Sequence, residues 1–170
     1  MSQHIVSKSG NGAQHLLRVM RLTALALVAA ALATAEVSNM SGTWILNEKR
    51  SRFGDNPRPA NVTLNIEHSE PKLRYSGTVN HPNEGHILDF QFDGSIDGKS
   101  YTSKQERGDR QITFKRRSDR SVESSSKWSD GELTSVITMS GDGRTLERRM
   151  SFRDREGRKR EWTEVYEKKQ

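Results

Sequence analysis

Two charged residues occupy positions where the sequence otherwise places apolar side chains. In residues 146–152 (LERRMSF), read as a β-strand with alternate residues on one face, Arg148 shares its face with a leucine, a methionine and a phenylalanine. In residues 162–166, Glu164 shares a face with a tryptophan and a tyrosine in the same way. An antiparallel hairpin that turns at residues 154–157 sets Arg148 opposite Glu164, close enough to pair. The sequence therefore predicts an ion pair between neighbouring strands.

Other hydrogen-bonding side chains occur at the same alternating positions as the apolar ones. A packed core rejects unpaired polar groups because burying them costs free energy. A barrel can instead hold a small ligand or water inside. We therefore predict a cavity wall, and the candidate ligand-cavity residues are Arg148, Glu164, Tyr166, Ser124, Ser126, Tyr75 and Tyr101. Because the ion pair neutralises itself, a neutral or zwitterionic ligand is favoured over a simple fatty acid. The alternative is a bulge that shifts the register and turns Arg148 outward.

The sequence contains no constellation that supports catalysis. It has no Gly-x-Ser-x-Gly elbow, no phosphate-binding loop and no His-Glu-x-x-His motif. His81 and His86 could at most join Asp89 as metal ligands, but exposed hairpin residues are the simpler interpretation because metal sites demand three or four ligands in fixed geometry. The serines at 124–126 have no nearby base and suit a strand wall. We expect a non-enzymatic protein with no cofactor and no metal.

An apolar leader precedes these residues. Residues 22–35 (LTALALVAAALATA) are uncharged, follow Arg18 and Arg21, and end in Ala-Thr-Ala. These are the three parts of a secretory signal peptide. A membrane anchor is the alternative, but a spanning helix needs about 20 apolar residues. We predict that residues 1–35 are a signal peptide, with Met20 as an alternative start. The mature protein, residues 36–170, is then a single secreted or periplasmic domain without a transmembrane segment.

Removal of the leader changes the charge balance. Residues 1–35 carry three of the 28 basic residues and no acid, so residues 36–170 have 25 bases against 22 acids. The formal charge falls from +6 to +3. Basic pairs such as Arg116-Arg117 therefore lie among acids, which is typical of a solvated surface of mixed charge. Nucleic-acid binding needs a concentrated basic face, so no nucleic-acid partner is expected.

The composition predicts a folded β-protein with a thin interior. The chain has no cysteine, so its stability must come from packing alone. Only 33 of residues 36–170 are apolar, about a quarter of that segment, and disorder is the alternative interpretation. The small net charge and the short alternating apolar runs argue against disorder. Ala60 is the only alanine after Ala35, which argues against helices.

Short alternating runs rich in Val, Ile, Thr, Tyr, Phe and Trp extend from residue 62 to residue 166. Turn dipeptides separate them, and we place tight turns at Asp93-Gly94, Asp97-Gly98, Asp130-Gly131 and Asp142-Gly143. In residues 133–139, apolar residues occur at both odd and even positions, so the sequence does not show which face points inward. We predict an all-β fold, an antiparallel up-and-down barrel of about 8–10 strands. A closed barrel leaves no edge strand exposed, and we expect a monomer.

Several motifs carry a resemblance to a known superfamily. Residues 41–46 (SGTWIL), with Gly42 and Trp44, resemble the Gly-x-Trp signature that opens the first strand of the lipocalins and fatty-acid-binding proteins, the calycins. Residues 164–168 (EVYEK) are similar to the closing strand of the fatty-acid-binding proteins. Residues 127–131 and the turn at 142–143 follow in the family's order. GTWILNEKRSRFG followed by IEHSEPKL most resembles small secreted lipocalin-like proteins of soil bacteria with no assigned activity.

The resemblance covers residues 41–168 and implies a barrel with an internal cavity. In the fatty-acid-binding proteins, an arginine two residues before the closing tyrosine helps to hold the ligand carboxylate. Here Glu164 takes the place of that arginine, while Tyr166 is kept. Only residues 47–61 separate the first two strands, so the helical lid of that family is missing.

Two classes of function remain. The first is a secreted carrier or sensor whose barrel binds a small lipophilic or zwitterionic ligand. The second is an exported interaction module with a filled interior, such as an enzyme inhibitor or a protein of the cell envelope, which acts through residues 53–60 (FGDNPRPA). An enclosed space above about 300 Å³ favours the carrier, because ligand pockets start near that size.

Overall fold

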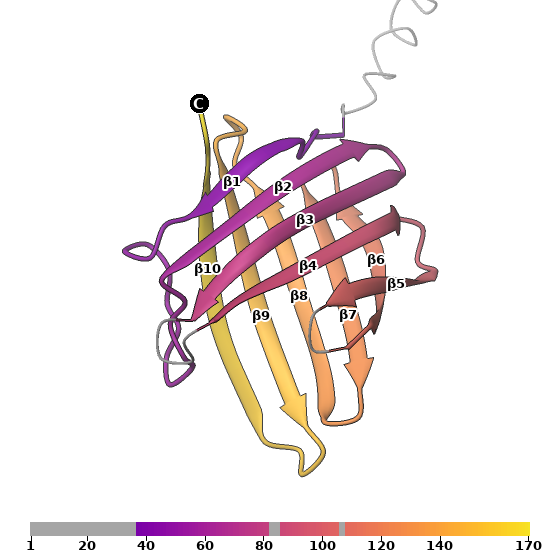
Figure 1. Ribbon diagram of the computed structural model, residues 1–170. Helices are drawn as coiled ribbons and strands as arrows, with labels where there is room; N and C mark the ends of the chain where they lie inside the picture. Colours follow the sequence, from indigo (N-terminus) through magenta and orange to yellow (C-terminus); the bar gives the residue numbers. More distant parts are fainter. Residues whose placement is uncertain (1–36, 82–85, 106–107) are drawn as a thin grey trace, which may run out of the picture. The chain divides into compact units, whose positions relative to one another are not determined.

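The structure is a computed structural model that describes residues 37–81, 86–105 and 108–170. The predicted signal peptide lies outside these residues. The described part consists of strands and connecting turns (Figure 1). Its ten strands are β1 (Gly42–Leu46), β2 (Asn61–Ser69), β3 (Lys72–His81), β4 (His86–Ser95), β5 (Ser100–Gln105), β6 (Arg110–Ser118), β7 (Ser121–Trp128), β8 (Gly131–Met139), β9 (Thr145–Asp154) and β10 (Lys159–Lys168).

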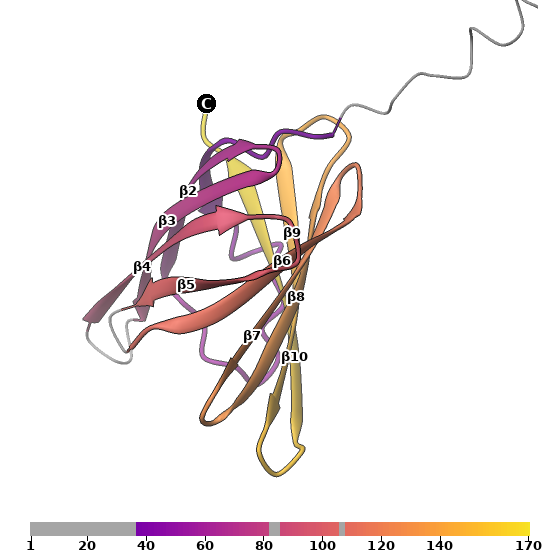
Figure 2. The same cartoon turned by 90° about the vertical axis from the view of Figure 1, so that its right-hand side faces the viewer.

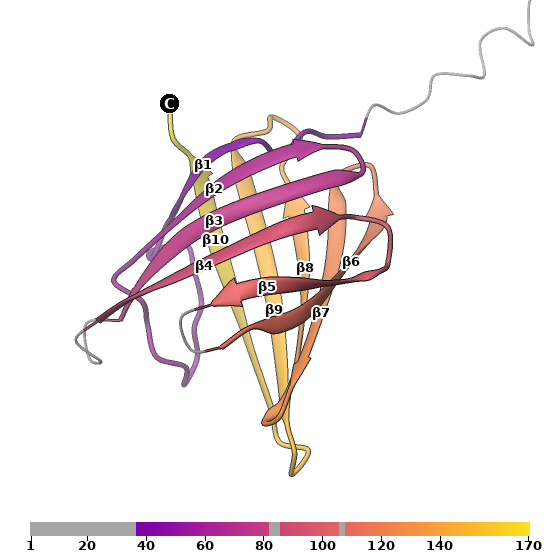
Figure 3. The same cartoon turned by 45° about the vertical axis from the view of Figure 1, so that its right-hand side comes forward.

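The strands form one closed antiparallel barrel, as predicted. Each strand pairs with the next in the chain, and β1 also pairs with β10, which closes the sheet. In Figure 3, β2 to β5 pass in front of β7 to β10. Figure 2 shows from the side that the β7–β8 and β9–β10 hairpins extend beyond the other strands.

The alternation in the sequence sets which side chains point inward. In β7 the burial pattern alternates strictly, with Val122, Ser124 and Ser126 buried. In β8, whose faces the sequence left open, Ser135 and Met139 are buried, so the odd-numbered residues face the interior. The buried apolar side chains include Trp44, Leu46, Leu73, Phe92, Ile112, Phe114, Val122, Leu146 and Tyr166. Stacked and edge-to-face contacts join Tyr75, Phe92 and Phe114 within this core.

One of the predicted turns is in the wrong place, and another is shifted by one residue. Asp93-Gly94 lies inside β4, and the chain turns later, at Gly98, whose φ is +79°. Gly94 is needed inside the strand because a Cβ there would lie 2.7 Å from Cγ of Tyr101. At the β7–β8 hairpin, Trp128 pairs directly with Gly131, so Ser129 and Asp130 make the turn. Aspartate-glycine dipeptides mark turns well but do not distinguish a turn from a crowded strand position.

The barrel has two ends with different coverings. The upper end in Figure 1 carries the β2–β3, β6–β7 and β8–β9 turns and the C-terminus, and the lower end carries the β7–β8 and β9–β10 turns. At the upper end, Trp44 is fully buried and Met40 is 4% exposed. The indole N–H of Trp44 donates to the Met40 carbonyl at 2.9 Å, and the ammonium of Lys168 lies 5.4 Å from the ring centre. The predicted signature tryptophan therefore closes the upper end.

Candidate ligand-binding cavity

A cavity of about 450 Å³ occupies the barrel interior. Its wall is mostly apolar and includes Val62, Leu64, Leu88, Ile112 and Leu133. Pro57 and Asp89 also line it, and both are exposed, so the cavity reaches the surface near them. A pocket of this size, with an apolar wall and a few polar groups, has the general form of a small-molecule site.

Arg148 and Glu164 form the predicted ion pair inside this cavity. They are direct partners in the β9–β10 register, and Nη1 of Arg148 lies 3.6 Å from Oε2 of Glu164. The Arg148 side chain is 29% exposed and the Glu164 side chain is 12% exposed. Both residues line the cavity, so the alternative in which Arg148 points outward is wrong.

Neighbouring side chains hold the carboxylate of Glu164 in place. The indole N–H of Trp162 donates to Oε1 at 3.0 Å, and the hydroxyl of Tyr166 donates to Oε2 at 2.7 Å. Each oxygen of Glu164 therefore already accepts a hydrogen bond from the protein, which lowers the cost of placing a carboxylate in the wall.

Serine hydroxyls continue the polar contacts on the other side of Arg148. Its Nε–H donates to Oγ of Ser135 at 3.4 Å, and Oγ of Ser135 lies 2.7 Å from Oγ of Ser124. The contacts thus run from Glu164 on β10 through Arg148 on β9 and Ser135 on β8 to Ser124 on β7. Four adjacent strands contribute to one polar network on the inner face.

Burial and charge both act on the ionisable groups of this network. Burial disfavours the charged form of Arg148, but the Glu164 carboxylate and the nearby tyrosines outweigh it and raise the pKa of Arg148. Burial, reinforced by the Glu164 carboxylate, raises the pKa of Tyr166 well above 10. Burial likewise raises the pKa of Tyr75. The guanidinium therefore stays charged and both phenols stay neutral at physiological pH.

The structure brings most of the predicted cavity residues together. Arg148, Glu164, Tyr166, Ser124, Ser126 and Tyr75 all line the cavity. Tyr101 does not, and its hydroxyl instead donates to Oδ2 of Asp97 at 2.9 Å. Tyr101 lies on the short strand β5, close to the β4–β5 turn, so its side chain reaches that turn rather than the cavity.

Sequence reasoning missed Ser135 and Trp162 as members of the polar network. Ser135 lies in β8, where apolar residues of both parities hid the inward face. Trp162 shares the inner face with Glu164 in the sequence pattern, and its N–H also fixes the Glu164 carboxylate. The spacing of Trp162 and Glu164, two residues apart on one strand face, was the signal that could have identified this contact.

The segment that the sequence offered as an interaction loop packs toward the cavity. Phe53 and Pro59 are buried, and both line the cavity together with Asn56 and Pro57. The turn is held by the Asn56 side-chain amide, which donates to the Phe53 carbonyl at 2.8 Å. Arg52 forms an isolated bridge with Thr163 of β10, which attaches the segment to the barrel wall.

The β7–β8 and β9–β10 hairpins carry a row of stacked side chains at the lower end. Trp128 stacks on Phe152 with ring centres 5.5 Å apart. The guanidinium of Arg110 lies 4.2 Å from the Trp128 ring, and that of Arg160 lies 5.0 Å from the Phe152 ring. Trp128 and Phe152 are only partly buried, so the stacked side chains at this end remain in contact with solvent. Trp44 at the upper end is, by contrast, fully buried.

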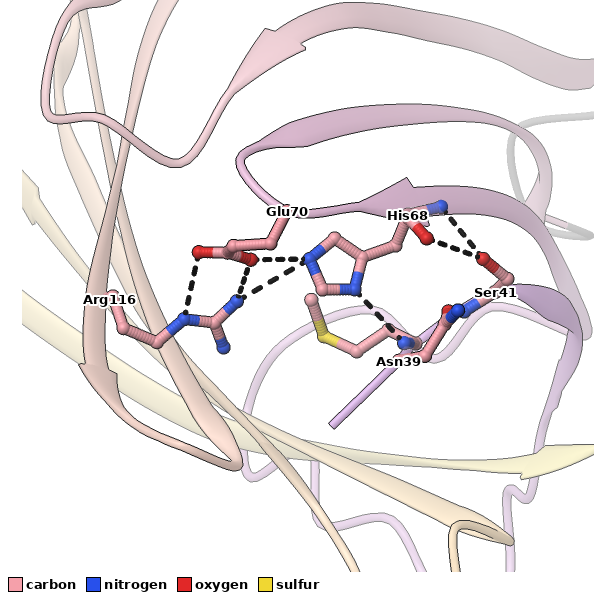
Figure 4. A network of polar contacts seen from close by, with 6 residues as sticks. Asn39, Ser41, His68, Glu70 and Arg116 are labelled. Carbon is pink, nitrogen blue, oxygen red and sulfur yellow. Dashed lines mark hydrogen bonds and ion pairs between the residues drawn. The ribbon is translucent and has the colours of Figure 1, made fainter. Parts of the chain in front are cut away.

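At the upper end, His68 is 5% exposed and joins three chain segments (Figure 4). Its Nδ1 accepts from the Met40 backbone N–H at 3.2 Å, which assigns the ring proton to Nε2, 2.7 Å from Oε2 of Glu70. The guanidinium of Arg116 donates to both oxygens of Glu70. Burial raises the pKa of Glu70, but the hydrogen bonds from Arg116 and His68 outweigh it, so the net shift in the Glu70 pKa is downward.

Ser41, His68 and Glu70 are residue types that form catalytic triads, but their geometry differs. The Ser41 hydroxyl donates to the His68 carbonyl at 3.1 Å and accepts from the His68 backbone N–H at 2.8 Å. It bonds to the backbone and not to the imidazole ring, so the ring does not act as its base. This network fastens residues 39–41 across the upper end.

The side chains of His81 and His86 lie outside the described part of the chain. Among the residues that are described, no group of three His, Asp or Glu side chains converges as a metal site requires. The same residues include no helix that is long and apolar enough to cross a membrane.

No protein-family model matches the chain, and no curated protein matches its sequence. The closed antiparallel barrel of ten strands is consistent with a calycin-like fold.

Proposed function

We propose that this protein is an exported, lipocalin-like carrier that binds a small and mostly apolar molecule inside its barrel, without catalysing a reaction. The observation that carries the proposal is the cavity of about 450 Å³, whose wall is apolar except for a few fixed polar groups. A barrel with a filled interior would leave no such space.

The polar network supports a binding role for the cavity. An ion pair within an apolar wall is costly, and well-packed apolar residues are often at least as stabilising. Here two hydrogen bonds orient Glu164, and the Arg148 side chain is in contact with the cavity space. This is the arrangement of a polar contact that fixes the orientation of an otherwise apolar ligand.

The segment at residues 53–59 supports the carrier over the interaction module. Phe53 and Pro59 direct their buried side chains toward the cavity and thereby extend its apolar wall. An exposed recognition loop would instead present such side chains to solvent. We therefore assign this segment to the wall of the ligand site.

Membership of the calycin superfamily is part of the proposal. It is supported by the up-and-down barrel together with the buried Trp44, whose N–H and ring are both engaged at the upper end. Export rests on the leader sequence at residues 1–35.

Native mass spectrometry of the protein purified from its own host tests the proposal. We expect a fraction of the protein to carry one retained small molecule, which dissociates when the gas-phase activation energy is raised. Protein that carries no small molecule, and that also fails to take up the neutral apolar dye Nile red, would contradict the carrier function. The same protein unfolded in denaturant serves as the control for non-specific adducts.

A further inference from the structure

Arg148 has hydrogen-bonding capacity that the protein does not use. A guanidinium has five N–H donors. The Nε–H is bonded to Ser135, whereas Nη1 lies 3.6 Å from Glu164, beyond hydrogen-bonding distance. The Tyr166 hydroxyl lies beside the guanidinium, but neither Nη1 nor Nη2 makes a hydrogen bond of ordinary geometry to a described residue. Since Arg148 lines the cavity, its unused donors are available to a molecule inside it.

Glu164 differs from Arg148 in this respect. Its two carboxylate oxygens accept hydrogen bonds from Trp162 and Tyr166, both from the same strand. It also acts electrostatically, because a negative charge beside Arg148 cancels the attraction that the guanidinium would otherwise exert on an anion. The polar end of the site is therefore rich in N–H donors but has no net charge.

We propose that Arg148 is the hydrogen-bond donor for an uncharged oxygen acceptor of the ligand, such as a ketone, ester or amide carbonyl, and that Glu164 excludes carboxylates. This inference rests on the proposed carrier function and names its ligand class. A carboxylate entering the site would lose its hydration and meet the charge of Glu164. An ammonium group would meet the positive charge of Arg148 beside Glu164. A carbonyl oxygen needs only the donors that Arg148 offers.

The remaining wall fits the rest of such a molecule. Met150 and Trp162 form the next cross-strand pair on the inner face of β9 and β10, beside the pair of Arg148 and Glu164. Ile112 on β6 and Leu133 on β8 also line the cavity. The ligand is thus expected to place its carbonyl against β9 and its hydrocarbon portion along these side chains.

Three ten-carbon probes that differ in their polar group test the inference on the full mature chain. Decan-2-one, decanoate and decylammonium are each titrated as competitors of Nile red. We expect decan-2-one to bind at least 10-fold more tightly than decanoate or decylammonium. Decanoate binding as tightly as the ketone would overturn the inference.

Two variants separate the roles of the pair. Arg148→Met with Glu164→Gln removes both charges while keeping the size of the side chains, and should weaken decan-2-one binding by roughly 10- to 100-fold, the value of a hydrogen bond to a charged group. Glu164→Gln alone leaves Arg148 unbalanced and should strengthen decanoate binding by about 10-fold or more. Arg149→Met, on the exposed outer face of the same strand, is the matched control and should change neither affinity.

Each result has a distinct meaning. Ketone binding that is unchanged in the double variant overturns the role of Arg148, and decanoate binding that is unchanged in Glu164→Gln overturns the role of Glu164. If the probes and Nile red bind with no preference for the ketone, the carrier function stands and this inference fails. If neither the probes nor Nile red bind the wild-type protein, the carrier function fails, and this inference fails with it.

Discussion

Arg148 on β9 and Glu164 on β10 are direct cross-strand partners on the inner face of the barrel, with Nη1 and Oε2 3.6 Å apart. Removing one partner leaves the other charge uncompensated against an apolar wall, whereas removing both does not. We therefore expect Arg148→Met and Glu164→Gln each to destabilise the fold more than the double variant does. In a double-mutant cycle by denaturant titration, the coupling free energy should be about 0.5–3 kcal/mol. Zero coupling would mean that the two side chains act independently.

The outer face supplies a matched control for this cycle. Arg149 and Glu147 form an ion pair of 2.6 Å, with the two side chains 74% and 40% exposed. Exposed pairs contribute little because water screens them. Arg149→Met and Glu147→Gln should show coupling near zero under the same conditions.

Trp44 is fully buried at the upper end of the barrel, and Trp44→Ala should cost about 3–5 kcal/mol of the free energy of unfolding. The large side chain leaves a cavity, and the carbonyl of Met40 loses its donor. Ile45→Ala changes the neighbouring residue, which is 38% exposed, and serves as the control. A loss below about 1 kcal/mol for Trp44→Ala would contradict its role in closing the barrel.

Ser124 and Ser126 make a matched pair on β7, because both are buried on the inner face but only one is hydrogen-bonded. Oγ of Ser124 is bonded to Ser135, while Oγ of Ser126 is the buried side-chain polar atom without a partner among the described residues. Ser124→Ala should lower the free energy of unfolding by about 1 kcal/mol. Ser126→Ala should leave it unchanged or raise it, because no hydrogen bond is lost. Equal losses in thermal or denaturant unfolding would show that Ser126 has a partner.

The contribution of Glu70 to stability should depend on pH. Since its pKa is lower in the folded protein than its ordinary value of 4.5, the carboxylate stabilises the fold fully above that value. The stabilisation is lost as the pH falls through the lower folded value. Glu70→Gln should therefore be destabilised relative to wild type at pH 7, with a difference that shrinks below about pH 4. Denaturant midpoints at several pH values measure this, with Glu67→Gln on the exposed face as the control.

Mature protein from the native host should begin at Glu36, because residues 22–35 have the apolar core and the Ala-x-Ala site of a cleaved leader. N-terminal sequencing or intact mass measures this directly. Ala35→Phe should block cleavage, since the site requires small residues, while Glu36→Gln should not. Retention of residues 22–35 in the wild-type protein would favour the membrane anchor.

The fold was predictable because local signals agree with one another along the chain. Alternation assigned the inner faces of β7 and β9 correctly, and the turn at residues 154–157 gave the register of β9 and β10. The pairing of Arg148 with Glu164 followed from that register alone. Period-two patterns carry this information because a shift by one residue would reverse a whole strand.

The parts of the site that were not predictable depend on contacts between distant residues. Ser135 lies in a strand whose pattern has no single parity, so only its neighbours on β7 and β9 reveal its direction. Residues 53–59 have no periodic pattern, and their position against the cavity depends on the bridge between Arg52 and Thr163. Tyr101 had the expected parity, but its long side chain reaches Asp97 in the adjacent turn.

The pairing of β1 with β10 has a consequence for how the protein folds. Leu46 and Tyr166 are direct partners, so the contact that closes the barrel joins strands from opposite ends of the described chain. Bringing such distant segments together has a high entropic cost, which slows folding in proteins dominated by contacts of this kind. Closure also requires β10, so a chain still being synthesised can form successive hairpins but cannot complete the ring. We therefore expect the cavity to be complete only after β10 has been synthesised and has paired with β1.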